Sequence, residues 1–144
     1  MPDRSYSHVP LSRKLGIREG ATVVVDGEPF ELEALLAPLP DGVRMKHAAD
    51  AGAGTVDVAL AFAVELATLA AQVDRLTPLL TPAGGLWLCS PKKASRVPTD
   101  ITFDRLQALG LDARLVDNKV ASINEVWTGF RFVRRLRDRG ADAS

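Results

Sequence analysis

Apolar and polar positions along the centre of the chain predict a strand, a helix and a second strand. Residues Val56–Phe62 are almost continuously apolar, as in a strand that is buried on both faces. From Glu65 onward, apolar residues recur every three or four positions and form one helical stripe: Leu66, Leu69, Val73, Leu76 and Leu80. Pro82 and Gly84–Gly85 predict the turn that ends this helix, and Leu86–Cys89 is the next apolar strand. Such a unit pairs its strands in parallel with a right-handed crossover, so the pattern predicts an α/β fold.

The flanking segments contain shorter versions of the same patterns. Before the central unit, the sequence predicts a short helix or turn at 11–20, a strand at Thr22–Asp26, a short helix at 30–37 and a strand at 43–48. After it, a helix capped by Asp100 or Thr102 runs to Gly110, and 112–120 and 125–134 form an antiparallel pair at the sheet edge. The predicted fold is a three-layer, Rossmann-like α/β domain with a mostly parallel sheet and an antiparallel C-terminal strand. We expect one domain at 11–137, between flexible segments at 1–10 and 138–144.

Charge and cysteine content narrow the classes of function. The 144 residues carry 18 Lys and Arg and 18 Asp and Glu, so the net charge is zero, which argues against a dedicated nucleic-acid binder. Basic residues are nevertheless concentrated near the C-terminus, at Arg131, Arg134, Arg135, Arg137 and Arg139. The single cysteine excludes an internal disulfide, and no signal peptide or membrane-spanning run is evident. We expect a cytoplasmic protein with no membrane partner.

The best candidate site lies beyond the carboxyl ends of the predicted strands, where ligands bind in open α/β sheets. Seven residues are expected at that edge: Asp26, Gly27, Glu65, Ser90, Lys92, Lys93 and Arg96. The basic loop after Ser90, together with a helix N-terminus near Asp100, is typical of a site for a phosphate or carboxylate. A solvated loop shaped by Pro91 and Pro98 explains the same residues equally well.

Other chemistry finds little support in the sequence. Cys89 ends an apolar strand without a base placed beside it, so it is expected to be a buried hydrophobe rather than a nucleophile. His8 and His47 are too few and too scattered for a metal site. We therefore predict no catalytic residue and no metal ligand, and we expect Trp87 and Trp127 to be packed in the core.

The layout resembles the class I S-adenosylmethionine-dependent methyltransferase fold. Residues 15–27 are similar to its lead-in and first strand, 56–60 to its fourth strand and 80–88 to the connection into its fifth strand. More closely, the chain resembles a family of short bacterial proteins known only as a domain of unknown function. That likeness rests on Tyr6–His8, Lys14–Ile17, Pro91–Ser95, Val97–Asp100 and Glu125–Gly129.

Three departures from the methyltransferase pattern shape the expected function. The turn at Asp26–Phe30 has one glycine, no acid ends the second strand, and only 30 residues separate Asp26 from Val56, so a strand and its helix are expected to be missing. These departures predict that S-adenosylmethionine is not bound. The resulting interpretation is a truncated methyltransferase-like domain, more binding protein than enzyme, that takes a small anionic ligand or a protein partner, including a second copy of itself. The alternatives are a minimal S-adenosylmethionine-dependent methyltransferase and a weak nucleic-acid binder that uses the C-terminal arginines.

Overall fold

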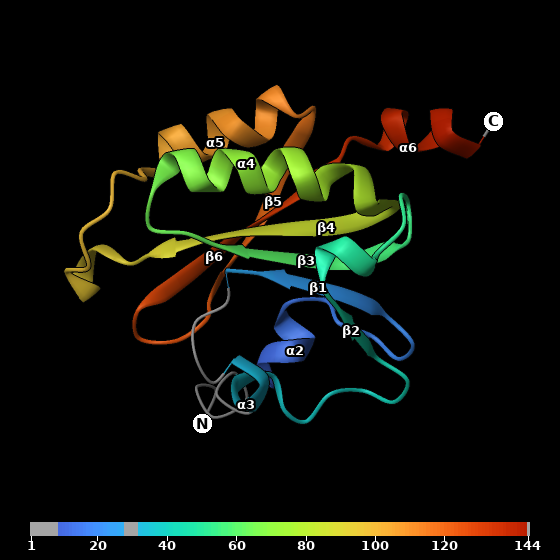
Figure 1. The fold of residues 1–144 in the computed structure, drawn as a ribbon, viewed down its shortest axis with the longest axis horizontal. Coiled ribbons are helices and arrows are strands. Elements are labelled where there is room, and N and C mark those ends of the chain that lie inside the picture. The colour runs from blue at the N-terminus through green and yellow to red at the C-terminus, as the bar shows by residue number, and fades with distance from the viewer. Residues whose placement is uncertain (1–8, 28–31, 144) are drawn as a thin grey trace.

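The protein folds around a single six-stranded sheet (Figure 1). The computed structural model describes residues 9–27 and 32–143, with backbone only for 140–143. The strands are β1 (Thr22–Asp26), β2 (Arg44–Lys46), β3 (Val56–Phe62), β4 (Leu80–Pro91), β5 (Leu115–Ser122) and β6 (Trp127–Arg134), in the order β2-β1-β3-β4-β6-β5. Only β6 runs antiparallel to its neighbours, β4 and β5. This confirms the predicted mixed sheet with its antiparallel C-terminal strand.

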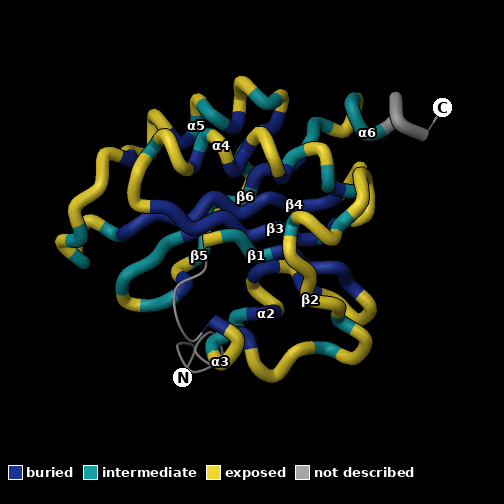
Figure 2. Tube along the Cα trace, in the orientation of Figure 1, coloured by how far each residue is buried: buried dark blue, intermediate teal, exposed yellow. Residues whose placement is uncertain are grey.

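Helices cover both faces of the sheet and complete three layers (Figure 1). The helices α4 (Leu66–Leu76) and α5 (Phe103–Asp112) cover one face, and the short helices α2 (Leu11–Lys14) and α3 (Leu32–Leu36) lie on the other. Burial follows this arrangement, because β3 and β4 are dark along most of their length while the outer sides of the helices are exposed (Figure 2). The α/β architecture predicted from the hydrophobic pattern is therefore confirmed.

Each face of the sheet has its own hydrophobic core. On the α4 face, Leu69, Val73 and Leu76 of the predicted helical stripe are at most 2% exposed and pack on β3 and β4. On the α2 face, Trp87 is fully buried, and its indole N–H donates to the Leu15 carbonyl at 3.0 Å. Trp127 is half-buried and meets Phe62 edge-on, with ring centroids 5.3 Å apart. Both tryptophans thus pack against the core, as the sequence predicted.

The start of β4 differs from the sequence-based expectation. We expected the central helix to reach Leu80 and Pro82–Gly85 to form a turn. The helix α4 ends at Leu76 instead, and Leu80–Gly85 belong to the strand. They pair irregularly with β3: Val56 is opposite Leu80 and Val58 is opposite Gly85, so the intervening residues of β4 form a bulge. Pro82 is tolerated there because a bulged residue needs no ladder hydrogen bond.

The connection between β2 and β3 is short. It contains the single-turn 3-10 helix η1 (Ala48–Asp50), and β2 is the edge strand, with all three residues exposed. The predicted strand at 43–48 is confirmed only over Arg44–Lys46, because the chain turns into η1 directly after it. Arg44 and Lys46 place charge on the edge, which discourages pairing with another sheet.

Two terminal segments complete the description. The helix α6 (Leu136–Ala143) occupies most of the segment 138–144, which we expected to be flexible. The expected flexible segment 1–10 falls largely outside the described residues, as do Tyr6–His8 and the end of the predicted Asp26–Phe30 turn. Among the residues that the structure describes, no helix is long and apolar enough to cross a bilayer.

Candidate functional site

The carboxyl ends of three neighbouring strands meet at one edge of the sheet. Asp26 at the end of β1 is in register with Ala61 of β3, and Phe62 of β3 is in register with Cys89 of β4. The Ala63 amide then donates to the Cys89 carbonyl at 3.2 Å and continues the ladder past β3. The structure therefore brings Asp26, Gly27 and Ser90 to the same edge, where the parallel pairing of their strands predicts them.

The turn after β1 packs directly on the end of β3. Gly27 has a φ of +69°, and a Cβ at this position would lie 2.4 Å from the Phe62 carbonyl oxygen. A residue with a side chain would be strained by the dihedral and would also collide with the backbone. The single glycine of this turn is thus required by its close approach to β3.

A buried glutamine from α4 closes the junction of β1 and β3. Gln72 is 2% exposed, and its Nε2 donates to the Phe62 carbonyl at 3.1 Å and to the Asp26 carbonyl at 3.4 Å. Its Oε1 is buried and has no hydrogen-bond partner within the described part of the chain. Because an unpaired buried acceptor costs free energy, Gln72 Oε1 is the polar atom at this junction with unused capacity.

One helical turn further along α4, Arg75 pairs with Asp26. The two side chains are joined by an Nη2–Oδ2 contact of 2.5 Å, and they are 49% and 29% exposed, respectively. This ion pair links α4 to β1 on the side of the sheet where η1 also packs. Because the β2–β3 connection is short, the residues that lie over the end of β1 come from η1 and from the polar side of α4.

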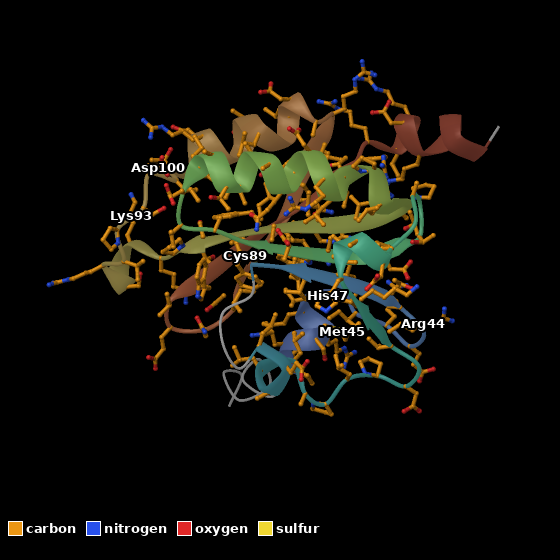
Figure 3. All side chains as sticks on the ribbon, in the orientation of Figure 1. Arg44, Met45, His47, Cys89, Lys93 and Asp100 are labelled. Carbon is orange, nitrogen blue, oxygen red and sulfur yellow. The ribbon has the colours of Figure 1, made fainter. Side chains whose placement is uncertain are left out.

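A cavity of about 440 Å³ lies beside this ion pair, and we call it the β1 cavity. Its polar lining consists of Asp26, His47 and Arg75, and its apolar lining consists of Val25, Ala48, Ala49 and Leu79. His47 is exposed and follows directly after β2 (Figure 3). Carboxylate, imidazole and guanidinium groups therefore line a space of the size that small-molecule sites have. Asp26 is the only one of the seven sequence-predicted site residues that lines it.

The predicted basic loop projects away from that cavity. Lys93 and Arg96 are exposed, and Figure 3 places Lys93 at the tip of the loop after β4, well apart from His47. Lys92 is held at the base of this loop, because its ammonium donates to Ser122 Oγ at 2.6 Å and its amide to the Val126 carbonyl at 2.7 Å. The seven predicted residues thus do not line one pocket.

The same loop blocks the N-terminus of α4. The Asp100 carboxylate accepts the Leu66 amide at 2.6 Å, and the Thr99 hydroxyl donates to the Val64 carbonyl at 2.5 Å. Glu65 is the exposed residue that precedes the helix, and its side chain makes no capping bond. The other helix near this loop, α5, is capped by Thr102, whose hydroxyl accepts the Arg105 amide. Of the two predicted caps for α5, Thr102 is therefore the one used.

The remaining candidates have structural surroundings. Cys89 is fully buried among Trp87 and the backbone of Gly129, and burial raises the pKa of its thiol above the ordinary value. In the chain outside 1–8 and 28–31, no cluster of three or more His, Cys, Asp or Glu side chains could hold a metal ion. Arg134 donates to the carbonyls of Thr77, Leu80 and Thr81, so it braces the start of β4.

Sequence reasoning overlooked Gln72, Arg75 and the closeness of His47 to Asp26. A signal for Gln72 was present, since Leu69, Gln72, Val73 and Leu76 follow the spacing of one buried helical stripe. A polar residue in such a stripe points to a specific hydrogen-bonding task. No such signal exists for the Asp26–Arg75 pair, whose members are far apart in the chain and meet only in the folded protein.

Comparison with solved structures identifies the fold. A methyltransferase from Aquifex aeolicus, described as S-adenosylmethionine-dependent, superposes with a TM-score of 0.62 at 15% identity, covering 91% of this chain and 88% of that one. A putative type 11 methyltransferase from Sulfolobus solfataricus gives 0.59 at 14% identity, with coverages of 94% and 92%. Geranyl diphosphate C-methyltransferase from Streptomyces coelicolor gives 0.59 at 12% identity, with coverages of 92% and 81%.

Sequence comparison adds no closer relative. No protein-family model matches the chain, and no curated protein sequence is significantly similar to it. At identities this low, the likeness to solved structures establishes the fold and nothing finer. The chain therefore has the Rossmann-like fold of class I S-adenosylmethionine-dependent methyltransferases, built on six strands.

Proposed function

We propose that this chain binds an adenosyl ligand of the S-adenosylmethionine class at the carboxyl edge of β1. The observation that carries the proposal is the β1 cavity, where Asp26 from the end of β1 and His47 from the end of β2 line the same space. Sequence analysis led us to expect the opposite, because the turn after β1 has one glycine, no acid ends β2 and the interval from Asp26 to Val56 is short. The residue that follows β2 is His47, which lines the β1 cavity, and an imidazole can donate to or accept from ribose hydroxyls.

The residues present match this ligand in size and chemical character. The cavity volume of about 440 Å³ falls within the range of small-molecule sites. Val25, Ala48 and Leu79 offer apolar contact to an adenine ring, and Asp26 and His47 offer hydrogen bonds to hydroxyl groups. Arg75 holds the Asp26 carboxylate in place. When bound, S-adenosylmethionine supplies an electrophilic methyl group on its sulfonium, and the residues named here would bind and orient the nucleoside.

The test is a calorimetric titration of S-adenosylhomocysteine into purified protein that mass spectrometry shows to be ligand-free. We expect micromolar binding, and we expect His47→Ala to weaken it about tenfold, which is the usual effect of losing one hydrogen bond to a ligand. Lys93→Ala is the matched control, because Lys93 is exposed at the far loop and its loss should leave the affinity unchanged. Absence of binding, or equal binding by the His47→Ala variant, would refute the proposal.

A small anion at the loop after β4 is the second candidate function. It is favoured by Lys93 and Arg96, which are both exposed, and neither forms an ion pair within the described residues. Binding of inorganic phosphate that is lost in Lys93→Ala but retained in His47→Ala would support this site. Titrating both variants with each of the two ligands therefore separates the two candidates.

A further inference from the structure

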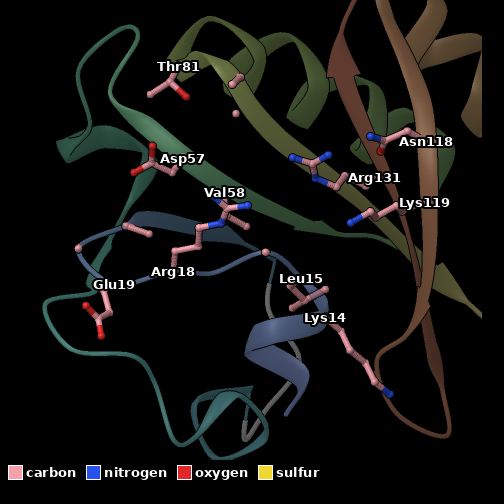
Figure 4. A pocket seen from close by; sticks show the side chains of 15 residues that line it. Lys14, Leu15, Arg18, Glu19, Asp57, Val58, Thr81, Asn118, Lys119 and Arg131 are labelled. Carbon is pink, nitrogen blue, oxygen red and sulfur yellow. The ribbon is translucent and has the colours of Figure 1, made fainter. Parts of the chain in front are cut away.

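A second and larger cavity lies at the opposite edge of the sheet. It has a volume of about 540 Å³, and its lining includes residues before β1, at the start of β3 and β4, and on β5 and β6 (Figure 4). The charged residues among them are Lys14, Arg18, Glu19, Asp57, Lys119 and Arg131, and we call this cavity the basic groove. Because the amino-terminal ends of the parallel strands form its floor, it is distinct from the β1 cavity at their carboxyl ends.

Arg131 lies across the floor of the basic groove. It pairs with Trp87 in the β4–β6 ladder, so both side chains lie on the α2 face of the sheet. A Cβ on Gly85 would lie 2.5 Å from Arg131 Nε, which shows that the guanidinium rests on a position without a side chain. Among the described residues, this guanidinium has no hydrogen bond to a protein acceptor and no ion pair.

Two further cations face the same space. In Figure 4, the side chains of Arg18, Lys119 and Arg131 point toward one another across the groove, whereas Lys14 and Glu19 point away from it. The Asp57 carboxylate borders the groove, but it already accepts the Thr22 amide at 2.9 Å. The three inward cations and this one carboxylate leave a net charge of about +2 in the groove.

The pKa of Arg131 reports the same crowding. Partial burial lowers the pKa of its guanidinium, and the positive charges of Arg139 and Arg18 lower it further. An arginine keeps its proton under these conditions, so the groove holds three mutually repelling positive charges, of which the Asp57 carboxylate offsets only one. A bound anion would relieve both the repulsion and the loss of hydration.

We infer that the basic groove binds a phosphorylated small molecule through Arg18, Lys119 and Arg131. A phosphate monoester carries a charge of about −1.5 to −2 near neutral pH, which matches the net charge of the groove. Guanidinium groups bind phosphate oxygens in a fork geometry, and two of the three cations are arginines. This inference does not depend on the proposed adenosyl site.

A neighbouring cavity defines the rest of the ligand. It shares Lys14 and Lys119 with the basic groove, has a volume of about 380 Å³, and is otherwise lined by Trp87, Val120, Ala121 and Ser122. Val120 is 65% exposed there. A ligand whose phosphate lies in the basic groove can thus place an apolar or aromatic group along β5. The inferred ligand is therefore an organic phosphate monoester rather than free phosphate.

The test is a titration of ¹⁵N-labelled protein followed by amide chemical shifts, with phenyl phosphate and inorganic phosphate as probes. Sodium chloride keeps the ionic strength constant, and the pH is held about two units above the second phosphate pKa of about 6. We expect saturable shifts at the amides of Arg18, Asp57 and Lys119, with phenyl phosphate binding more tightly than inorganic phosphate. Arg131→Gln should weaken binding at least about tenfold, as expected for a charge-assisted hydrogen bond.

A second variant guards against misfolding of Arg131→Gln. Arg18 and Lys119 are exposed, so the double variant Arg18→Gln/Lys119→Gln should fold normally and should also lose binding. Lys93→Gln is the control and should bind like the unaltered protein. Shifts that do not saturate below about 10 mM, or that persist in the double variant, would overturn the inference.

Two other outcomes are also decisive. Shifts confined to the Lys92–Arg96 loop would move the anion to the second candidate site. Tight binding of a single-stranded oligonucleotide with a steep salt dependence, competing with phenyl phosphate, would make the groove a nucleic-acid surface instead. S-adenosylhomocysteine should shift only the amides near Asp26 and His47, and phenyl phosphate only those of the basic groove. Failure of one site is therefore distinguishable from failure of the other.

Discussion

Gly27→Ala offers the sharpest check of how the turn after β1 meets β3. The chain contains a matched control in Gly54: their φ values are +69° and +70°, but a Cβ on Gly54 would meet no atom within 4 Å. Both alanine variants bear the cost of a left-handed backbone, about 1–2 kcal/mol. Only Gly27→Ala also forces a side chain against the Phe62 carbonyl, where overpacking adds about 1–3 kcal/mol.

Urea unfolding followed by tryptophan fluorescence measures the difference between the two variants. For a domain of this size, the unfolding free energy falls by about 2 kcal/mol per molar urea, so the midpoint of Gly27→Ala should lie about 0.5–1.5 M below that of Gly54→Ala. The slope of the transition should be the same for both, since the fold is unchanged. Equal midpoints would show that the turn does not pack on β3, and the argument from the Gly27–Phe62 approach would fail.

Two further predictions concern the buried Cys89 thiol and the start of α4. Because burial raises the pKa of the Cys89 thiol, the native protein should resist thiol reagents until urea unfolds it. The unfolding free energy should also fall as the pH rises above the unfolded thiol pKa of about 8.5, because only the unfolded state then loses the proton. Cys89→Ala should abolish that pH dependence, and rapid labelling of the folded protein would contradict the buried position. Asp100→Ala should lower the unfolding free energy by about 1 kcal/mol, because the Leu66 amide at the start of α4 loses its acceptor. Asp104→Ala, in the first turn of α5, is its control, and a loss as large as that of Asp100→Ala would contradict the capping role.

The elements that the sequence predicted well are those whose pattern is local. Val56–Phe62 and Thr22–Asp26 match the observed strands because buried parallel strands are short, β-branched and bounded by turn residues. The start of β4 was missed because proline and glycine ordinarily end a strand, and nothing local reveals that β3 offers a partner for a bulge there. α6 was missed because its polar sequence has no apolar stripe that would predict a buried helix.

The candidate sites show the same division between local and tertiary information. Parallel pairing allowed Asp26, Gly27 and Ser90 to be assigned to one edge, since that inference needs only strand direction. The position of His47 near Asp26 depends on how η1 packs beside β1, and the position of Arg18 near Arg131 depends on how the segment after α2 packs beside the sheet. Neither arrangement follows from spacing along the chain.

The order of strands in the sheet constrains the sequence of events during synthesis. β6 is the last strand made, yet it lies between β4 and β5 in the sheet. β5 therefore leaves the ribosome before β6, its partner in the described part of the chain. Until Trp127–Arg134 emerges, β4 and β5 each lack the strand that pairs with them in the folded protein. Insertion of β6 between β4 and β5 is therefore a late step that pairs both strands at once, and completion of the sheet depends on the C-terminal strand.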